Sequence, residues 1–367
     1  MKNTIRIAHI MGKLQSGGVE SVVFNYYKEI DKNLYQFDFF YDSDSTVAPP
    51  KELVDLGANF IKTPPYQNLF AYLFNLKRHF RNNKYLIVHS HLNTLSVFPL
   101  FVAWICKIPV RIAHNHSVPG GEGIVRTFIK HFLKCFSKVF STNYFACSEK
   151  AGRWMFGDKS FSKGDVVVIK NAVNFEKFNF SKIQIESLKR KLGIIHKKII
   201  LHVGRFTFAK NHKFLLSVFK EISKTHDDYM LMLVGDGELH KEIYDLVDLY
   251  KISDKVIFIG QVKDPYIYYS VADILAVPSF FEGLSLVTIE SQISKVPCVV
   301  SKAIPKEAFI SNGCLQLELD VDLWVKSIIN FSDDMVIIDD RSKEYDIKYA
   351  VKILEKEYMQ LIGGYNA

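Results

Sequence analysis

The sequence predicts an α/β protein made of two doubly wound, Rossmann-like domains that face each other across a cleft. Short apolar runs typical of strands alternate with amphipathic, helix-like stretches almost throughout, which is the pattern of parallel α/β sheets. The chain has 367 residues, which is too long for one ordinary hydrophobic core and favours two domains. Because such sheets bind ligands at the carboxyl ends of their strands, functional residues are expected at those ends.

The first half contains six predicted strands with helix-like segments between them. The strands are 5–10, 37–41, 58–61, 85–91, 110–116 and 144–148. The helices are 19–30, 50–56, 68–82, 93–106, 124–140 and 149–156. In the second half, helices again separate the strands, which are 199–203, 229–235, 256–260, 273–278 and 297–301.

The strand VVVIKN at 166–171, followed by a polar segment, is the best candidate for a domain boundary. We therefore predict a first domain over 1–170 and a second domain over 171–345. A terminal helix over 346–367 is expected to pack back onto the first domain.

Composition limits the class of protein. With 48% hydrophobic and 23% charged residues, the chain is globular. The five cysteines never form a CxxC pair, which favours a reducing, cytoplasmic compartment and argues against disulfides or a cysteine zinc site. The beginning, MKNTIRIAHIMGK, lacks the apolar core of a signal peptide, and the most apolar stretch, 95–106, is too short to span a bilayer.

Positive charge is concentrated in the first half. Residues 1–170 contain 22 Lys and Arg against 12 Asp and Glu, whereas 171–367 contain 25 against 27. Within 60–140 there are 11 basic residues and a single acid, Glu122. An anionic partner is therefore expected for this half, either a membrane surface or a polyanion.

The segment 124–140 combines a basic stripe with an apolar face. Arg126, Lys130, Lys134 and Lys138 recur at intervals of four residues. The apolar face consists of Val125, Phe128, Ile129, Phe132, Leu133, Phe136, Val139 and Phe140. The pattern fits a core helix with a solvated outer face, but four cations without an intervening acid also fit an anionic membrane surface.

Two loops that follow predicted strands favour an anionic ligand. SGGVES places Gly17 and Gly18 at a helix start, where backbone amides attract an anion, although paired glycines are also typical of a plain tight turn. GRFTFAKNH places Arg205 and Lys210 before a helix, and two cations there suit a diphosphate. The alternative for this second loop is a pair of solvated surface charges.

The motifs HSH and HNH end two predicted strands of the first half. Histidines that alternate in this way, His89 with His91 and His114 with His116, can ligate a metal ion. No further ligands are evident at other strand ends of that half, so no metal site is predicted. The histidines also fit a core position with hydrogen bonds to the backbone, or one of them faces the cleft and acts on a substrate hydroxyl.

The stretch SFFEGLSLVTIE places Glu282 and Glu290 eight residues apart. Gly283 puts Glu282 on the loop that enters a helix, and Glu290 lies two turns further along. A solvated acidic face fits poorly, because the apolar residues between the two carboxylates make this element largely buried. Both carboxylates therefore need polar partners.

Taken together, these segments resemble the retaining GT-B glycosyltransferases of family 4, and in particular bacterial exopolysaccharide and capsule transferases. The resemblance rests on several motifs in order along the whole chain. They are SGGVE, VGRFTFAKNHKFLLSVF at 203–219, VGDGEL at 234–239, ADILAVPSFFEGLSLVTIESQISKVPCVV at 272–300 and SKAIPKE at 301–307.

The resemblance implies a donor site for a nucleotide sugar, with UDP as the expected nucleotide, and no cofactor. Glu290 would hold the ribose hydroxyls and Glu282 would lie beside the donor sugar. Arg205 and Lys210 would neutralise the leaving diphosphate, so that no metal ion is needed. The amides that would meet the sugar and the diphosphate are those of Gly283, Leu284 and Ser285.

Further roles follow from the same resemblance. Gly17 and Gly18 would belong to the glycine loop that closes over the phosphates from the first domain. His116 matches the histidine that contacts the donor sugar, with His114 as the alternative. Val262 lies where the family contacts the base through its backbone.

The resemblance also implies a partner and a location. The acceptor would be an oligosaccharide linked to a polyprenyl diphosphate, the transferred sugar would be a hexose or N-acetylhexosamine, and residues 60–140 would dock on the inner face of the cell membrane. One departure is NAVN at 171–174, where the family usually has NGVD. Two other classes of protein fit parts of the sequence: a metal-dependent hydrolase built on the histidine pairs, and a nucleic-acid binder that uses the basic residues of 60–140. The latter lacks a recognised motif, so no nucleic-acid partner is expected.

Overall fold

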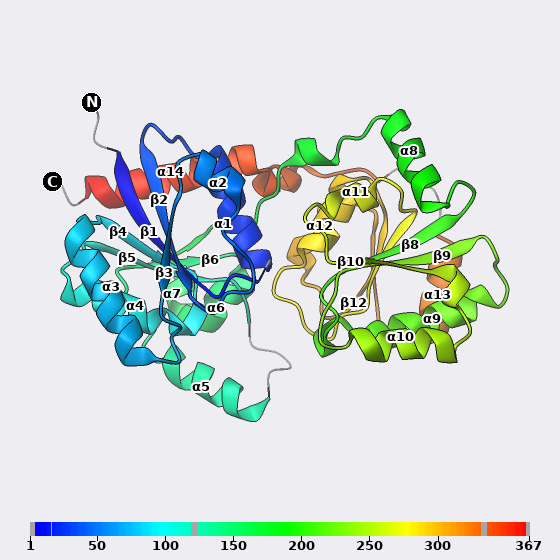
Figure 1. Ribbon diagram of the computed structural model, residues 1–367, viewed down its shortest axis with the longest axis horizontal. Helices are drawn as coiled ribbons and strands as arrows, with labels where there is room; N and C mark the ends of the chain where they lie inside the picture. The colour runs from blue at the N-terminus through cyan, green and yellow to red at the C-terminus, as the bar shows by residue number, and fades with distance from the viewer. Residues whose placement is uncertain (1–3, 16, 119–122, 332–335, 365–367) are drawn as a thin grey trace. The chain divides into compact units, whose positions relative to one another are not determined.

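The computed structural model describes residues 4–15, 17–118, 123–331 and 336–364. The chain forms two compact units (Figure 1). Unit 1 comprises residues 1–173 and 343–367, and unit 2 comprises residues 174–342. The division expected from the sequence, at 170/171, lies three residues before this boundary.

Unit 1 is built on a sheet of seven parallel strands in the order β3-β2-β1-β4-β5-β6-β7. The strands are β1 Ile5–Gly12, β2 Tyr35–Asp42, β3 Asn59–Thr63, β4 Ile87–Ser90, β5 Val110–Asn115, β6 Asn143–Ala146 and β7 Val166–Val168. The helices are α1 Gly18–Glu29, α2 Lys51–Asp55, α3 Leu69–Asn83, α4 Val97–Ile105, α5 Ile124–Lys134, α6 Glu149–Phe156, α7 Asp158–Ser162 and α14 Ile347–Gly363.

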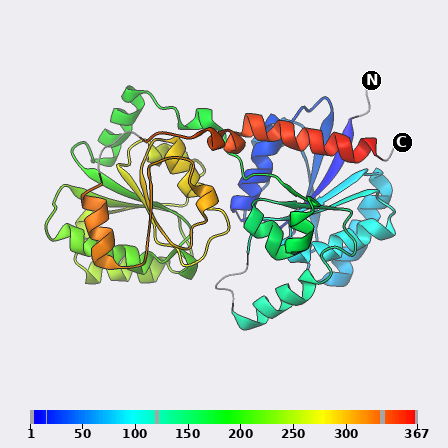
Figure 2. The same cartoon turned by 180° about the vertical axis from the view of Figure 1, so that it is seen from behind.

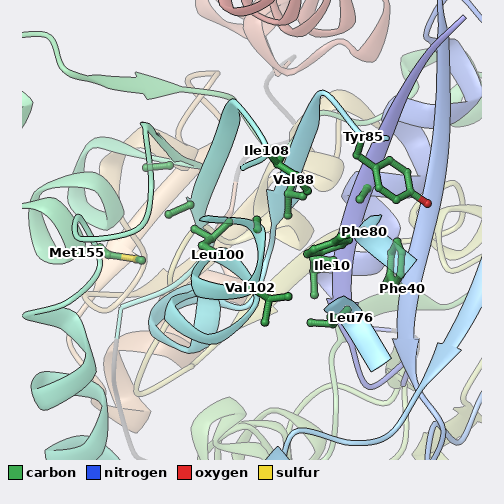
Figure 3. Packing of buried hydrophobic residues seen from close by; sticks show 14 of the residues in the cluster. Ile10, Phe40, Leu76, Phe80, Tyr85, Val88, Leu100, Val102, Ile108 and Met155 are labelled. Atoms are coloured by element: carbon green, nitrogen blue, oxygen red, sulfur yellow. The ribbon is translucent and has the colours of Figure 1, made fainter. Parts of the chain in front are cut away.

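Helices α3, α4 and α6 cover one face of this sheet. Alternate residues of the strands, such as Ile10 on β1 and Val88 on β4, meet Leu76 of α3 and Leu100 of α4 in a buried apolar cluster (Figure 3). Because side chains alternate along a strand, the residues between them point to the opposite face. That opposite face carries the histidines of β1, β4 and β5.

The helix α14 returns from unit 2 to unit 1 and lies beside α1 (Figures 1 and 2). Asp346 caps its start by accepting a hydrogen bond from the Lys348 amide at 3.0 Å. Tyr358 of α14 is fully buried, and its hydroxyl lies 2.7 Å from Nδ1 of His89. The terminal helix therefore covers the histidine-bearing face of the first sheet.

Unit 2 contains a sheet of six parallel strands in the order β10-β9-β8-β11-β12-β13. The strands are β8 Lys198–Val203, β9 Tyr229–Val234, β10 Val256–Gly260, β11 Ile274–Val277, β12 Cys298–Ser301 and β13 Cys314–Leu317. The helices are α8 Lys182–Leu192, α9 His212–Ser223, α10 His240–Leu249, α11 Tyr266–Tyr269, α12 Leu286–Ile293 and α13 Val321–Ile329.

Two parallel-sheet units confirm the predicted fold class. The strand β13 is absent from the sequence prediction, because its four residues, CLQL, are too few to show a periodic pattern. The predicted helix over 124–140 is too long, since α5 ends at Lys134. None of the helices within the described residues combines the length and the apolar character needed to cross a membrane.

The interpretation of this segment as a core helix is wrong for α5. Phe128 and Phe132 are 72% and 58% exposed, and Val125 and Ile129 are exposed as well. Only Leu133 of the predicted apolar face of α5 is buried. An amphipathic pattern shows which residues share a face, but it does not show whether another element covers that face.

Candidate active site

The loop after β8 carries the two predicted phosphate-binding cations. Arg205 is exposed and lies two residues beyond the end of β8, and Lys210 lies in the short helical turn that precedes α9. Gly204 leaves room for the Lys210 side chain to pack against the backbone, because a Cβ at position 204 would lie 3.3 Å from Cδ of Lys210. Both cations therefore lie at the carboxyl end of the first strand of unit 2, as predicted.

Lys210 and Glu282, 72 residues apart in the sequence, form an ion pair. Their side chains are 21% and 12% exposed, so water screens the pair only partly. The Ser279 hydroxyl donates to the same carboxylate oxygen at 3.1 Å. The sequence assigned these two residues to neighbouring parts of a ligand, and the structure brings them into direct contact.

The loop after β9 supports this arrangement through close backbone contact. A Cβ on Gly235 would lie 2.0 Å from the carbonyl oxygen of Gly204, and one on Gly237 would lie 2.5 Å from that of Phe206. Gly235 also has a φ of +138°, which favours glycine. The GDG sequence thus lets the β9 loop hold the cationic β8 loop in place.

Glu282 lies on the loop that enters α12, and Glu290 lies within the helix, as predicted. The Tyr269 hydroxyl donates to Oε2 of Glu290 at 2.8 Å. Burial raises the pKa of Glu290 to about 7, and the hydrogen bond from Tyr269 opposes that shift. Near neutral pH this carboxyl group is therefore close to half protonated.

The segment between the two glutamates forms the start of α12. Leu284 and Ser285 are buried and Gly283 is partly exposed. Ser285 is the N-cap residue, but its hydroxyl accepts from the Thr288 hydroxyl at 2.9 Å instead of capping a backbone amide. The first amides of the helix are therefore not capped by this side chain, which suits an anionic ligand.

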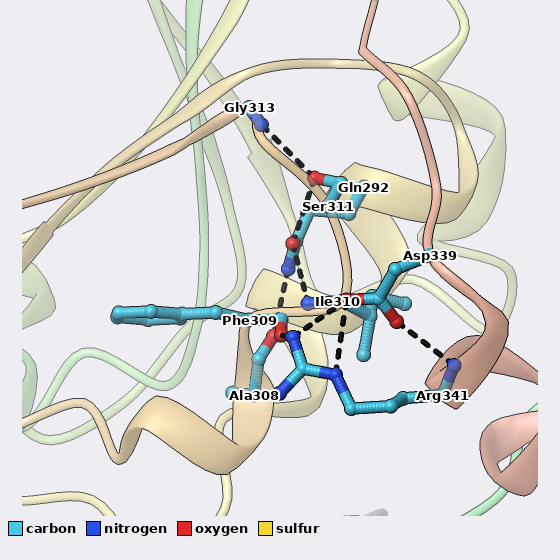
Figure 4. A network of polar contacts seen from close by, with 8 residues as sticks. All are labelled: Gln292, Ala308, Phe309, Ile310, Ser311, Gly313, Asp339 and Arg341. Carbon is cyan, nitrogen blue, oxygen red and sulfur yellow. Dashed lines mark hydrogen bonds and ion pairs between the residues drawn. The ribbon is translucent and has the colours of Figure 1, made fainter.

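A buried amide holds α12 to the following loop (Figure 4). Gln292 donates to the carbonyl of Ala308 at 2.7 Å and accepts from the Ile310 amide at 2.9 Å and the Ser311 hydroxyl at 2.9 Å. On the other side of this loop, Arg341 donates to the carbonyl of Phe309 at 3.0 Å. This network fixes the helix that carries Glu290.

Unit 2 also contains a pocket of about 470 Å³ at the ends of β9 and β10. Its wall includes Tyr244 stacked on Phe258, with ring centroids 4.1 Å apart, and His240 stacked on Tyr244 at 5.2 Å. Val262, which the sequence analysis expects to contact the base, lies two residues beyond the end of β10. It is therefore close in the sequence to Gly260, which lines this pocket. The stacked rings were missed because they come from separate elements.

In unit 1, Gly17 is the N-cap residue of α1 and Gly18 its first residue, while Ser16 lies outside the described residues. Glu20, which sequence reasoning did not single out, is buried and accepts a hydrogen bond from the Gln15 amide at 2.8 Å. A Cβ on Gly17 would lie 2.6 Å from its carboxylate. A side chain at position 17 would therefore displace the Glu20 carboxylate from its present position.

His114 and His116 are both buried, at 3% and 6% exposure. The interpretation of these residues as core histidines with hydrogen bonds to the backbone is wrong in its choice of partner. The ring nitrogens of the HSH and HNH motifs contact one another and the Tyr358 hydroxyl. His9 of β1 joins the same group, with Nδ1 3.0 Å from Nε2 of His91. His9 was missed, although its position in IRIAHI places it on the same face.

Two Rossmann-like units of seven and six parallel strands, with two cations and the E-x7-E segment at the strand ends of the second, define the GT-B class of glycosyltransferases. The family model described as Glycosyltransferase Family 4 matches residues 16–177, and that described as Glycosyl transferases group 1 matches residues 184–333. Together these matches span most of the chain, which belongs to glycosyltransferase family 4. The membership predicted from the sequence is confirmed.

Relatives agree with this assignment. The chain is 28% identical over 333 residues to the putative glycosyltransferase EpsF of Bacillus subtilis (strain 168), covering 88% of this chain and 86% of EpsF. It is 24% identical over 275 residues to the UDP-Gal:alpha-D-GlcNAc-diphosphoundecaprenol alpha-1,3-galactosyltransferase of Escherichia coli, covering 72% and 71%. The crystal structure of Anabaena HepE in complex with UDP and glucose is similar in fold, with a TM-score of 0.79 at 16% identity, covering 96% and 99%.

Proposed function

We propose that this chain is a retaining glycosyltransferase that moves a hexose or N-acetylhexosamine from a UDP-sugar to a lipid-linked surface polysaccharide. The observation that carries the proposal is the convergence of Lys210, Glu282 and the start of α12 at the strand ends of unit 2. A cation, a carboxylate and helix-terminal amides within one unit suit a diphosphate joined to a sugar.

In this proposal the nucleotide lies along the strand ends of unit 2. Glu290 accepts hydrogen bonds from the two ribose hydroxyls, since a carboxylate has acceptor sites for both. The aromatic pocket at Tyr244 and Phe258 receives the base, because stacked rings bind a flat base well. Val262 then contacts the base through its backbone.

The proposed reaction breaks the bond between the sugar C1 and the phosphate oxygen of UDP. The acceptor oxygen bonds to C1 from the same face, and the acceptor proton passes to the leaving phosphate. Lys210 and Arg205 stabilise the negative charge that develops on the diphosphate, so this step needs no metal ion. Glu282 is proposed to lie beside the reacting sugar.

Relatives support the donor and acceptor classes. The name of the Escherichia coli relative gives a UDP-galactose donor and a diphosphoundecaprenol-linked acceptor, and HepE is a fold neighbour whose structure contains UDP and glucose. We extend the same classes to this chain. The acceptor's lipid stays in a bilayer, so the protein is proposed to work at the cytoplasmic surface of the membrane.

The donor class is tested with a panel of nucleotide sugars and the full-length protein. We expect UDP-hexoses or UDP-N-acetylhexosamines to raise the thermal unfolding midpoint, because a ligand that binds only the folded state stabilises it. GDP-mannose and ADP-glucose should give no shift at the same concentration. Stabilisation by a GDP-sugar or ADP-sugar alone would contradict the UDP assignment, and product NMR would show whether the anomeric configuration is retained.

The exposed face of α5 strengthens the proposed contact with the membrane. Phe128 and Phe132 project from α5 on the face roughly opposite the basic stripe, in a segment rich in cations. An apolar aromatic face opposite a lysine-rich face is typical of helices that lie at the interface of an anionic bilayer. Each Lys or Arg near such a surface contributes about 1 kcal/mol.

We expect the protein to bind anionic liposomes and not neutral ones, with weaker binding at moderate salt because salt screens the attraction. Changing Arg126, Lys130, Lys134 and Lys138 to glutamate should abolish the binding in a flotation assay. A matched control changes the basic residues of α8 in unit 2, which are Lys182, Lys189, Arg190 and Lys191, and should bind normally. Equal binding to neutral and anionic liposomes, or normal binding by the first variant, would refute the role of this stripe.

A further inference from the structure

Five histidines lie together on one face of the sheet of unit 1. His9 and His89 are register partners on β1 and β4, and His114 lies on the neighbouring β5. His91 and His116 follow two residues after His89 and His114, so they lie on the same face. All five are between 1% and 6% exposed.

The surroundings keep these imidazole rings neutral. Phe37, Phe145 and Tyr358 contact the group through their rings, with Phe37 only 4.0 Å from His9 between centroids. Burial lowers the pKa of His9 to about 3 and that of His116 to about 4. A neutral imidazole has one N–H and one lone pair, and a lone pair is what a metal ion binds.

The rings form two short hydrogen-bonded chains. In the first, His9 Nδ1 lies 3.0 Å from His91 Nε2, and His91 Nδ1 lies 2.9 Å from His116 Nε2. In the second, His89 joins Tyr358 to His114, with His89 Nε2 3.0 Å from His114 Nδ1.

The chains leave buried nitrogens unsatisfied. His9 Nε2 and His114 Nε2 have no hydrogen-bond partner among the described residues. A buried polar atom without a partner destabilises the folded protein. An unpartnered ring nitrogen of a neutral histidine can offer its lone pair to a metal ion.

We propose that His91, His114 and His116 bind one divalent transition-metal ion of the zinc class. One ring nitrogen from each of these residues lies within 4.8 Å of the others. Zinc–nitrogen bonds of about 2.0–2.1 Å in a tetrahedron place the nitrogens about 3.3–3.4 Å apart. His91 Nδ1 and His116 Nε2, now 2.9 Å apart, would separate by about 0.4–0.5 Å to receive the ion.

The other histidines then have a role as supporting residues. If His114 binds through Nε2, its Nδ1–H donates to His89 Nε2, which is already 3.0 Å away. If His91 binds through Nδ1, its Nε2–H donates to His9 Nδ1, also 3.0 Å away. Metal-binding histidines almost always donate a hydrogen bond from their second ring N–H in this way.

The third ligand has an acceptor of its own. Asn171 raises the pKa of His116 as a hydrogen-bond acceptor, against the larger lowering effect of burial. When His116 binds the ion through Nε2, its Nδ1–H is directed to the Asn171 side chain, whose Oδ1 has no other partner among the described residues. Each of the three ligands then has an acceptor of its own, whereas Nε2 of His9 stays without a partner among the described residues.

A set of three neutral imidazoles selects the metal class. Imidazole nitrogen suits zinc, copper and nickel, whereas magnesium and calcium prefer oxygen ligands. The second possible group, which is His9, His89 and His91, shares His91 with the first, so a single ion is proposed. This site goes beyond the proposed function, because the donor-binding groups all belong to unit 2.

The experiment uses the full-length protein, stripped with a chelator and then incubated with Zn²⁺. After desalting we expect close to one zinc per chain in the wild type and a rise in the unfolding midpoint. His91→Asn should lose the bound zinc and the rise. His79→Asn, a matched change on α3 of the same unit and outside the cluster, should retain both. His89→Gln should bind about 10–100-fold more weakly, as expected for a supporting residue.

Cobalt gives an independent measurement that needs no variant. Co²⁺ in a tetrahedral nitrogen site has intense visible absorption, so the wild type should become coloured with one equivalent. No retained zinc and no cobalt absorption in the folded wild type would overturn the proposal, as would full zinc retention by folded His91→Asn. UDP binding by the metal-free protein is measured in parallel, so that a failure of the donor assignment is seen separately.

Discussion

Replacing Lys210 with alanine is expected to lower turnover by about a hundredfold or more, because a preorganised cation at the leaving group stabilises the transition state by a few kcal/mol. Lys210 lies on a loop and keeps 21% exposure, so the fold should survive its loss. The measurement is the initial rate of sugar transfer, or of UDP release, at saturating donor.

The matched control is Lys213→Ala. Lys213 lies three residues further along, and its side chain is 58% exposed in a surface ion pair with Glu242. Surface pairs of this kind contribute little, so this variant should keep its rate and its unfolding midpoint. Because Lys210→Ala also leaves Glu282 without its cation, the unfolding midpoint of that variant must be measured too. A folded Lys210→Ala protein with near-wild-type turnover would rule out the assigned role.

The second large effect is expected at Glu290. Glu290→Gln keeps the shape of the side chain but removes the charge that strengthens its bonds to the ribose. Donor affinity should therefore fall by about tenfold or more, as for loss of a charged hydrogen bond, whereas Glu282→Gln should mainly lower turnover. Calorimetry with UDP measures the first effect. Unchanged UDP affinity in Glu290→Gln would show that this carboxylate does not hold the nucleotide.

The raised pKa of Glu290 adds a pH dependence to this prediction. With a pKa of about 7 in the donor-free protein, the carboxyl group is largely protonated at pH 6 and ionised at pH 8. Because the ribose hydroxyls need an acceptor, UDP affinity should rise between pH 6 and pH 8 in the wild type. The part of this rise that is due to Glu290 should be absent in Glu290→Gln. If UDP affinity in Glu290→Gln had the same pH profile as in the wild type, titration of Glu290 would not be its cause.

The same shift has a consequence for stability with the opposite sign. The folded-state pKa lies above the ordinary value of 4.5 for a glutamate, so the folded state binds more protons than the unfolded state between about pH 4.5 and 7. The contribution of this group to stability is therefore lost as the pH rises through that window. The difference in unfolding free energy, Glu290→Gln minus wild type, should therefore be more favourable to the variant at pH 8 than at pH 4.5. Denaturant unfolding of both proteins at both pH values measures this difference.

Much of the fold could be predicted because it depends on local patterns. The strand β10 has the predicted bounds, Val256–Gly260, and α6 has the predicted bounds, Glu149–Phe156. Alternating and helical periodicity reflect the burial of neighbouring residues along the chain, so short segments are enough to show them. The position of Glu282 on a loop and Glu290 on a helix was equally accessible, because Gly283 separates the two.

The amino-acid sequence by itself determined the α/β class, the order of the strands along the chain and the family motifs. Only the tertiary structure decided which distant side chains meet, as with Tyr269 and Glu290 or His9 and His91. It also decided that the apolar face of α5 stays uncovered. Periodicity shows the direction in which a side chain points from its own element, whereas its partner depends on which other element packs there, and that is settled by the whole chain.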